Sequence, residues 1–231
     1  MRRLAVFDVD GTIFRSSLTR RLFSYLVNEG IFPVQARKEV EPYLRAWLNR
    51  KGDYGDYLNK LVDVFVHHIK GKRQKDVRRI ARQVVSSEKS QVYRFTRDLI
   101  EDLRKKNYFL VAISGSPFEI VRWYNRFLRF DRTYGWVLAV DARGRYTGKM
   151  KYMYSVFDKK FLVEHVVKRY GVTLKGSVAV GDTESDLSMF EVVERPIAFN
   201  PSMKLFRHAR AHKWEIVVER KDVIYRFGGK K

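Results

Sequence analysis

Short apolar runs alternate with helical periodicity along most of the chain. Leu4–Phe7 is a run of this kind, and an apolar run without alternation is typical of a parallel strand buried on both faces. Similar runs follow at residues 110–113, 178–180, 197–199 and 216–218, with helical patterns between them at 98–105, 118–128 and 161–170. Strands that alternate with helices predict an α/β fold, a Rossmann-like parallel sheet with helices on both faces.

The segment after the first strand has a different pattern. Residues 15–93 lack strand-like runs and show helical spacing, as in Leu58, Leu61 and Phe65. We therefore expect an α/β core formed by residues 1–14 and 94–231, with a helical cap domain at residues 15–93. Residues 71–75 read as an exposed connection between cap helices, and residues 136–147 as a strand that turns into a hairpin.

Composition narrows the class of protein. Of the 231 residues 45% are hydrophobic, so the chain can fill a core, and with no cysteine it cannot form disulfides or Cys-based metal sites. The first apolar run is four residues long and ends at Asp8, so we expect neither a signal peptide nor a membrane span, and a cytoplasmic protein. The sequence leaves the oligomeric state open.

The net charge of +21 predicts attraction to anions, although a basic surface without a specific partner is an equal alternative. Residues 15–94 hold 18 Lys and Arg against 8 Asp and Glu, and are more basic per residue than the rest. Candidate partners are phosphorylated metabolites, nucleic acid and an acidic membrane surface.

The first candidate for chemistry is Asp8-x-Asp10-Gly11-Thr12, directly after the first strand. Carboxylates two residues apart at a strand end can converge on one site, and Gly11 permits a turn. One carboxylate could attack phosphorus while the other moves protons to and from oxygen. Such a motif alone also builds calcium loops and plain turns.

Three further polar features lie at, or lead into, other predicted strand ends, where open α/β sheets bind ligands. Ser114-Gly115 can bind a phosphoryl oxygen through a hydroxyl and a backbone N–H. Lys159-Lys160 opens a predicted helix, and Asp182 and Asp186 supply oxygen ligands of the kind that Mg²⁺ prefers. Separately these features also fit a turn, a solvated lysine pair and an N-cap.

Together the features follow the order acid pair, hydroxyl, lysine, acid pair. This order resembles the haloacid dehalogenase (HAD) superfamily of phosphatases. The insertion after the first strand and the stretches 178–190, 197–201 and 214–216 are similar to its phosphoserine-phosphatase-like branch, subfamily IB.

The resemblance implies a Mg²⁺-dependent phosphomonoester hydrolase that acts through an aspartyl-phosphate. Asp8 would be the nucleophile and a metal ligand, and Asp10 the general acid/base, with its backbone carbonyl on the metal. Ser114 and Gly115 would hold the phosphoryl group. Spacing favours Lys159 over Lys160 as the neutralising lysine. Asp182 would bind the metal directly. Asp186 would act on the metal through a water molecule, or would orient Lys159.

The sequence matches the substrate of phosphoserine phosphatases less well than it matches their catalytic motifs. Residues 13–21 contain no acidic side chain to hold the amine of phosphoserine. Arg15, Arg20 and Arg21 lie there instead and predict a more anionic small phosphorylated substrate. We therefore do not expect strict specificity for phosphoserine.

Other patterns compete with this interpretation. His208 and His212 have a metal-binding spacing but lie in a basic segment, and we interpret them as a solvated face, and His67-His68 as a helix end. The aromatics of 118–130 alternate with arginines, a pattern found in nucleic-acid binding, although we expect an amphipathic helix with its aromatics inward. The rival functions are a basic nucleic-acid or anionic-surface binding protein with the same fold, and a polynucleotide-end phosphatase.

Overall fold

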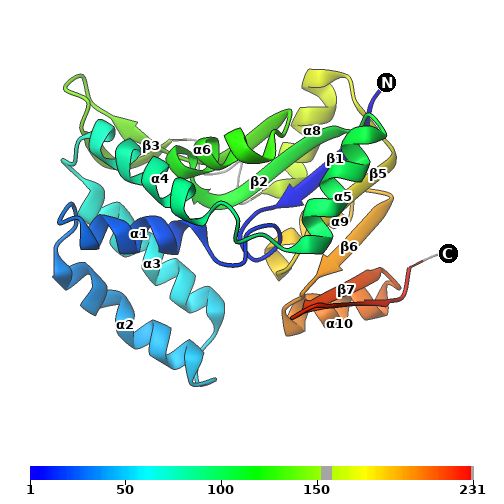
Figure 1. Ribbon diagram of the computed structural model, residues 1–231, viewed down its shortest axis with the longest axis horizontal. Helices are drawn as coiled ribbons and strands as arrows, with labels where there is room; N and C mark the ends of the chain where they lie inside the picture. The colour runs from blue at the N-terminus through cyan, green and yellow to red at the C-terminus, as the bar shows by residue number, and fades with distance from the viewer. Residues whose placement is uncertain (152–157, 230–231) are drawn as a thin grey trace.

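The computed structural model describes residues 1–151 and 158–229 (Figure 1). Its centre is an eight-stranded sheet in the order β4-β3-β2-β1-β5-β6-β7-β8. The strands are β1 (Arg3–Asp8), β2 (Phe109–Pro117), β3 (Arg132–Val140), β4 (Tyr146–Lys151), β5 (Thr173–Gly181), β6 (Arg195–Phe199), β7 (Glu215–Arg220) and β8 (Val223–Phe227).

The six strands from β3 to β7 pair in parallel, and antiparallel β4 and β8 flank them. Each of the five apolar runs lies in a parallel strand, and all of their residues are buried except the half-buried Val218. In β1, residues Leu4–Phe7 are fully buried because the strand has neighbours at both sides and helices above and below. The predicted mostly parallel α/β sheet is confirmed.

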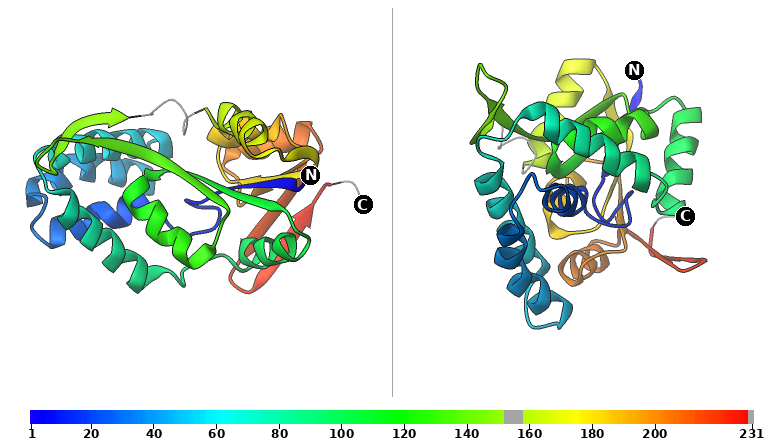
Figure 2. Two further views of the ribbon diagram at one scale, coloured as in Figure 1. Left: turned by 90° about the horizontal axis from the view of Figure 1, so that it is seen from above. Right: turned by 60° about the vertical axis from the view of Figure 1, so that its left-hand side comes forward.

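Helices cover both faces of the sheet. Figure 2 (left) shows α5 (Arg94–Lys105) and α6 (Phe118–Leu128) on one face, with α8 (Lys159–Tyr170) and α10 (Met203–Ala211) on the other. The 3₁₀ turn η1 (Glu184–Asp186) leads into α9 (Leu187–Phe190). Each of the longer helices buries one apolar face, as α5 does with Phe95, Ile100 and Leu103.

Four helices lie between β1 and α5: α1 (Leu18–Asn28), α2 (Val34–Leu48), α3 (Tyr54–Ile69) and α4 (Gln74–Glu88). Three of them gather to one side of the sheet, and α4 lies beside α6 (Figure 1). This segment has apolar contacts of its own. For example, Phe32, which lies between α1 and α2, packs edge-on against both Phe23 of α1 and Phe65 of α3. The helical character of this segment agrees with the sequence pattern, whereas its status as a separate cap domain at residues 15–93 stays a prediction.

The hairpin β3–β4 extends from the sheet to the helical segment. β4 packs against α3, and the fully buried Trp136 of β3 meets Phe65 of α3 edge-on, with ring centroids 5.4 Å apart. Trp136 Nε1 also donates a hydrogen bond of 2.9 Å to the carbonyl of Gly115. One side chain of the hairpin therefore contacts both the helical segment and the end of β2.

The prediction that the aromatics of α6 all point inward is wrong in part. Tyr124 and nearby Phe130 are buried, but Phe127 is 42% exposed and Trp123 is half-buried. The reason is spacing, since Trp123 and Phe127 are four residues apart and share a stripe beside the buried one.

The histidines lie where the sequence placed them. His67 and His68 are in the last turn of α3. His208 and His212 stack on each other and on Trp214 at the end of α10. Within residues 1–151 and 158–229, no helix combines the length and the apolar character that a membrane crossing needs.

Candidate active site

Three adjacent strands bring the candidate residues together. β2, β1 and β5 are neighbours in the sheet and run in parallel, so their carboxyl ends meet at one edge. Asp8 ends β1, Ser114 lies near the end of β2, and Asp182 follows the last residue of β5. Lys159 reaches the same edge from the first turn of α8, which Asp158 caps by accepting a hydrogen bond from the Phe161 N–H.

Lys159 is buried between two carboxylates. Its Nζ lies 2.7 Å from Asp8 Oδ1 and 2.5 Å from Asp186 Oδ1. Burial by itself lowers the pKa of a lysine, but the charges of Asp186 and Asp8 outweigh it and raise the pKa of Lys159. Lys159 is therefore a fixed cation at the site, whereas Lys160 is exposed.

Asp186 is held by the backbone as well. Its Oδ2 accepts hydrogen bonds from the N–H groups of Asp182, at 2.9 Å, and Thr183, at 3.0 Å. A Cβ on Gly181 would lie 2.3 Å from Asp186 Cγ, so only glycine lets the turn close this tightly around the carboxylate. Asp186 thus orients both Lys159 and the loop that carries Asp182.

Asp10 occupies a separate hydrogen-bonded position. Its Oδ2 accepts a hydrogen bond of 2.6 Å from the Ser114 hydroxyl and one of 2.9 Å from the Ser116 hydroxyl. Its Oδ1 accepts a hydrogen bond of 2.5 Å from the Leu18 N–H. Burial raises the pKa of Asp10 in spite of these donors. A raised pKa favours the protonated form, which is the form a general acid needs.

Sequence reasoning missed Ser116 as a functional residue. Its hydroxyl also lies 2.8 Å from the Thr19 hydroxyl of α1 and accepts a hydrogen bond from the Thr19 N–H. The signal was present in the sequence as the second hydroxyl of Ser114-Gly115-Ser116. What the sequence does not display is that α1 lies over this loop.

The metal-binding expectation can be tested on the donor atoms. Asp8 Oδ2 is buried and has no hydrogen-bond partner among the described residues. Burial and the charge of Asp8 raise the pKa of Asp182 well above its usual range. An unpartnered carboxylate oxygen next to a second carboxylate fits a divalent cation, which would relieve their repulsion.

The cation would have few side-chain ligands. In the part of the chain that the structure describes, no three His, Cys, Asp or Glu side chains group as a metal site. The ligand set that we expect is two carboxylates, Asp8 and Asp182, completed by the Asp10 backbone carbonyl and by water or phosphate oxygens.

Gly11 controls the approach of Asp182. Its φ is +84°, and a Cβ there would lie 2.1 Å from Asp182 Oδ2. The Thr12 hydroxyl donates to the other oxygen, Asp182 Oδ1, at 3.2 Å. β1 therefore ends in the nucleophile candidate, Asp8, and the turn after it fixes the carboxylate that follows β5.

Two of the three candidate arginines form ion pairs outside the carboxylate cluster. Arg15 pairs with Glu219 at 3.2 Å, and Arg21 with the buried Glu88 at 2.7 Å. Arg20 is half-buried and donates 2.9 Å to Ser16 Oγ. Arg20 belongs to the first turn of α1, whose Leu18 and Thr19 N–H groups donate hydrogen bonds to Asp10 and Ser116.

Tyr54 and Tyr93 were not predicted to belong to the site. Burial, followed by the charges of Asp10 and Asp182, raises the pKa of Tyr54. Burial and the charge of Asp182 raise the pKa of Tyr93, which precedes α5. The pKa of each phenol therefore responds to the charge of the carboxylates, but neither tyrosine lies in a motif that the sequence reveals.

Comparisons with known proteins agree with this geometry. A model of the haloacid dehalogenase-like hydrolase family matches residues 5–191. An "inhibition of morphological differentiation protein" of Streptomyces azureus is 24% identical over 94% of this chain and 78% of its own. A phosphoserine phosphatase of Methanocaldococcus jannaschii is 24% identical over 96% of this chain and 94% of its own.

A solved structure shares the fold. It is a phospho-aspartyl intermediate analogue of phosphoserine phosphatase, which superposes with a TM-score of 0.65 at 22% identity and covers 96% of this chain and 95% of that one. The match to the family model, which includes Asp8, Ser114, Lys159 and Asp182, spans most of the chain. The chain belongs to the haloacid dehalogenase-like hydrolases, and within that family it is similar to phosphoserine phosphatases.

Proposed function

We propose that the chain is a Mg²⁺-dependent phosphomonoester hydrolase that acts through a phosphorylated Asp8. The observation that carries the proposal is the state of Asp8. One of its oxygens accepts a hydrogen bond from the buried Lys159, and the other is buried without a hydrogen-bond partner among the described residues. Lone pairs on a carboxylate with a neighbouring fixed cation suit attack on an anionic phosphoryl group.

The first half-reaction transfers the phosphoryl group to the protein. A carboxylate oxygen of Asp8 forms a bond to phosphorus while the bond from phosphorus to the ester oxygen breaks. Protonated Asp10 gives its proton to the departing oxygen. Lys159 offsets negative charge at Asp8 throughout, since its contact with Asp186 holds it in place.

The second half-reaction releases phosphate. Asp10, now ionised, takes a proton from water, and the water oxygen bonds to phosphorus as the bond to Asp8 breaks. The Ser114 hydroxyl and the Gly115 N–H would bind phosphoryl oxygens. Mg²⁺ held by Asp8, Asp182 and the Asp10 carbonyl would supply charge neutralisation between carboxylate and phosphate.

We infer that the substrate is a small phosphorylated metabolite with an anionic group beyond its phosphate. The first turn of α1, which lies over the site, contains no acidic residue to pair with an ammonium group. Arg20 lies in that turn instead, and Tyr54 of α3 has a pKa that burial and the charge of Asp10 raise. Phosphoserine hydrolysis that saturates at micromolar substrate would defeat this inference.

The class of reaction can be tested with p-nitrophenyl phosphate. We expect hydrolysis that requires Mg²⁺ and that Asp8→Asn abolishes, because an amide is a poor nucleophile. Equal rates for wild type and Asp8→Asn would contradict the proposal.

The intermediate can be tested separately. We expect a rapid acid quench to trap the phosphorylated protein. The peptide that contains Asp8 should then be heavier by about 80 Da, the mass of one added phosphoryl group (HPO₃). With p-nitrophenyl phosphate, whose phenolate departs without a proton, Asp10→Asn should accumulate this species, because the water that attacks phosphorus then lacks its base. Label on another residue would exclude Asp8 as the nucleophile.

The substrate class requires a different measurement. We expect Arg20→Ala to raise KM for the preferred metabolite in a phosphorylated-compound screen and to leave kcat and p-nitrophenyl phosphate hydrolysis nearly unchanged. Lys160→Ala, which removes an exposed cation, is the matched control.

A further inference from the structure

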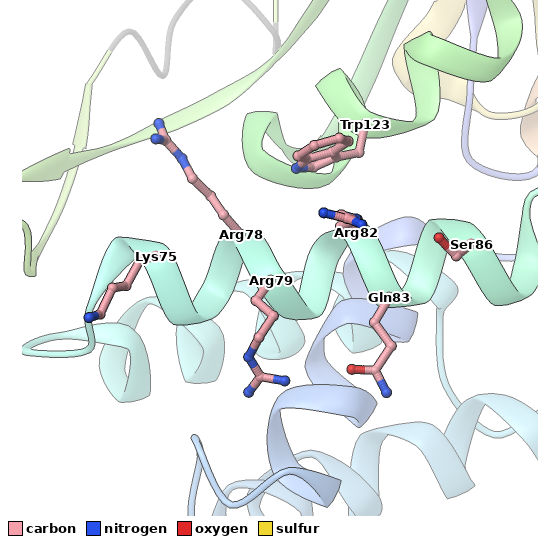
Figure 3. Close-up of a pocket in the computed structure, with 7 residues that line it drawn as sticks. All are labelled: Lys75, Arg78, Arg79, Arg82, Gln83, Ser86 and Trp123. Carbon is pink, nitrogen blue, oxygen red and sulfur yellow. The ribbon is translucent and has the colours of Figure 1, made fainter.

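A basic hollow lies between α4 and α6. It has a volume of about 510 Å³. Its lining, which we call the α4–α6 groove, consists of Lys75, Arg78, Arg79, Arg82, Gln83, Ser86 and Trp123. Six of the seven come from α4, and Figure 3 shows Trp123 of α6 next to Arg82. None of these residues belongs to the cluster around Asp8.

The cations of the groove share one helix face. Lys75, Arg78, Arg79 and Arg82 are spaced at i, i+3, i+4 and i+7, which brings them onto one side of α4. Arg79 lies 3.7 Å from Glu29. Across residues 1–151 and 158–229 the other three form no ion pair, and Arg78 Nε is buried without a hydrogen-bond partner. Neighbouring cations repel each other, so a bound polyanion would stabilise this surface.

Aromatic rings accompany the cations. Two guanidinium groups lie over the Trp123 ring, that of Arg126 at 4.1 Å and that of Arg82 at 6.0 Å from its centroid. Phe127, one turn further along α6, is 42% exposed. The side of α6 that faces the sheet is filled by Tyr124 instead. The outer side of α6 therefore offers flat rings among positive charges.

We propose that the α4–α6 groove binds single-stranded nucleic acid. The cations of α4 contact backbone phosphates, and an unpaired base stacks on Trp123 in place of a guanidinium group. A duplex would hide its base faces from this ring. A lipid surface would call for apolar side chains that project beyond the cations, whereas Trp123 lines the hollow between them. The site is separate from the proposed phosphatase site and does not rest on it.

The proposal can be tested by fluorescence anisotropy of a labelled dT20 oligonucleotide. EDTA in the buffer prevents any metal-dependent turnover. The main variant is Lys75→Gln/Arg82→Gln, which removes two exposed cations from the groove. We expect at least tenfold weaker binding at 0.1 M salt. The plot of log K for binding against log salt concentration should become shallower by about 1.4, since each lost phosphate contact on a single strand contributes about 0.7 to the steepness of the slope.

A second variant separates stacking from charge. Trp123→Ala should weaken binding of dT20 about tenfold and leave the salt slope unchanged, because no phosphate contact is lost. Far-UV circular dichroism and p-nitrophenyl phosphate hydrolysis, both expected to match wild type, show that each variant is folded.

The matched control removes one lysine and one arginine elsewhere. Lys168 and Arg169 are exposed on α8, across the sheet from α6 (Figure 2). Lys168→Gln/Arg169→Gln should change binding less than twofold. Equal losses in the two double variants would overturn the proposal, as would no binding of dT20 by wild type. Two further results would also overturn it: duplex bound as tightly as dT20 with Trp123→Ala unaffected, or groove-dependent binding of anionic phospholipid vesicles alone.

Discussion

Lys159 Nζ bridges Asp8 and Asp186, at 2.7 Å from Oδ1 of the first and 2.5 Å from Oδ1 of the second. All three side chains are buried, so the contacts are weakly screened by solvent. The lysine thus joins the end of β1 to the turn after β5. Its removal leaves two buried carboxylates without their cation.

We expect Lys159→Met to lower kcat about 100- to 1,000-fold, the usual effect of removing a charge-stabilising group from an active site. It should also destabilise the protein by about 3 kcal/mol, because breaking a buried ion pair leaves unpaired charge. Steady-state kinetics and urea unfolding measure the two effects. Lys160→Met, at the exposed neighbouring position, should match wild type in both. Similar losses in the two variants would show that Lys159 has no special role.

Asp182→Asn should stabilise the metal-free protein while abolishing activity. Burial and the charges of Asp8 and Asp186 raise the pKa of Asp182, so its ionised form is unfavourable in the folded state. An amide keeps the shape and removes the repulsion. Thermal unfolding in EDTA should give a higher midpoint for the variant, whereas millimolar Mg²⁺ should raise the midpoint of wild type alone. A lower midpoint in EDTA would contradict this.

The stability of the metal-free protein should fall as pH rises from about 4 to about 7. Burial, and next to it the charges of Asp186 and Asp10, raise the pKa of Asp8 from 3.8 to about 7, although Lys159 opposes the shift. Over that interval the folded state binds more protons than the unfolded state, so unfolding becomes easier with increasing pH. Urea unfolding at several pH values measures the slope. Asp8→Asn should give a flatter slope, and parallel curves would exclude Asp8 as the cause.

Gly11→Ala should strongly reduce activity and stability. Alanine is strained at a φ of +84°, and its Cβ would lie 2.1 Å from Asp182 Oδ2, so the carboxylate that we propose as a metal ligand must move. Gly144→Ala is a matched control, with a φ of +71° and no atom within 4 Å of the added Cβ. The control should cost only the backbone strain, about 1 kcal/mol, and retain full kcat. Equal kcat in both variants would separate Gly11 from the placement of Asp182.

The sheet could be predicted from the sequence because its strands are buried on both faces. A run such as Val178–Val180 is apolar whichever neighbour it meets. The edge strand β8 escaped prediction, since most of Val223–Phe227 is exposed and burial imposes no pattern on it. The same physical cause hid the outward side of α6, where Phe127 has helical spacing but no core to face.

The candidate site was predictable where a residue stands at a strand end or, as with Lys159, where its spacing along the chain matches that of the resembling family. Asp8 and Asp182 stand directly at strand ends, so topology alone brings them together. Ser116 meets Thr19, 97 positions earlier, and Arg15 meets Glu219, 204 positions later. Such pairings depend on how helices lie over the sheet edge, which periodicity does not encode.

The position of Trp136 has a mechanical consequence. Its ring packs on Phe65 of α3, and its indole N–H donates a hydrogen bond to the carbonyl of Gly115. One side chain therefore connects α3 to the proposed phosphate-binding turn. A shift of α3 toward a substrate cannot leave this turn untouched. Where α3 contacts the distal part of a substrate, we expect that contact to shift the proposed phosphate-binding turn, and the fluorescence of this indole to change with it.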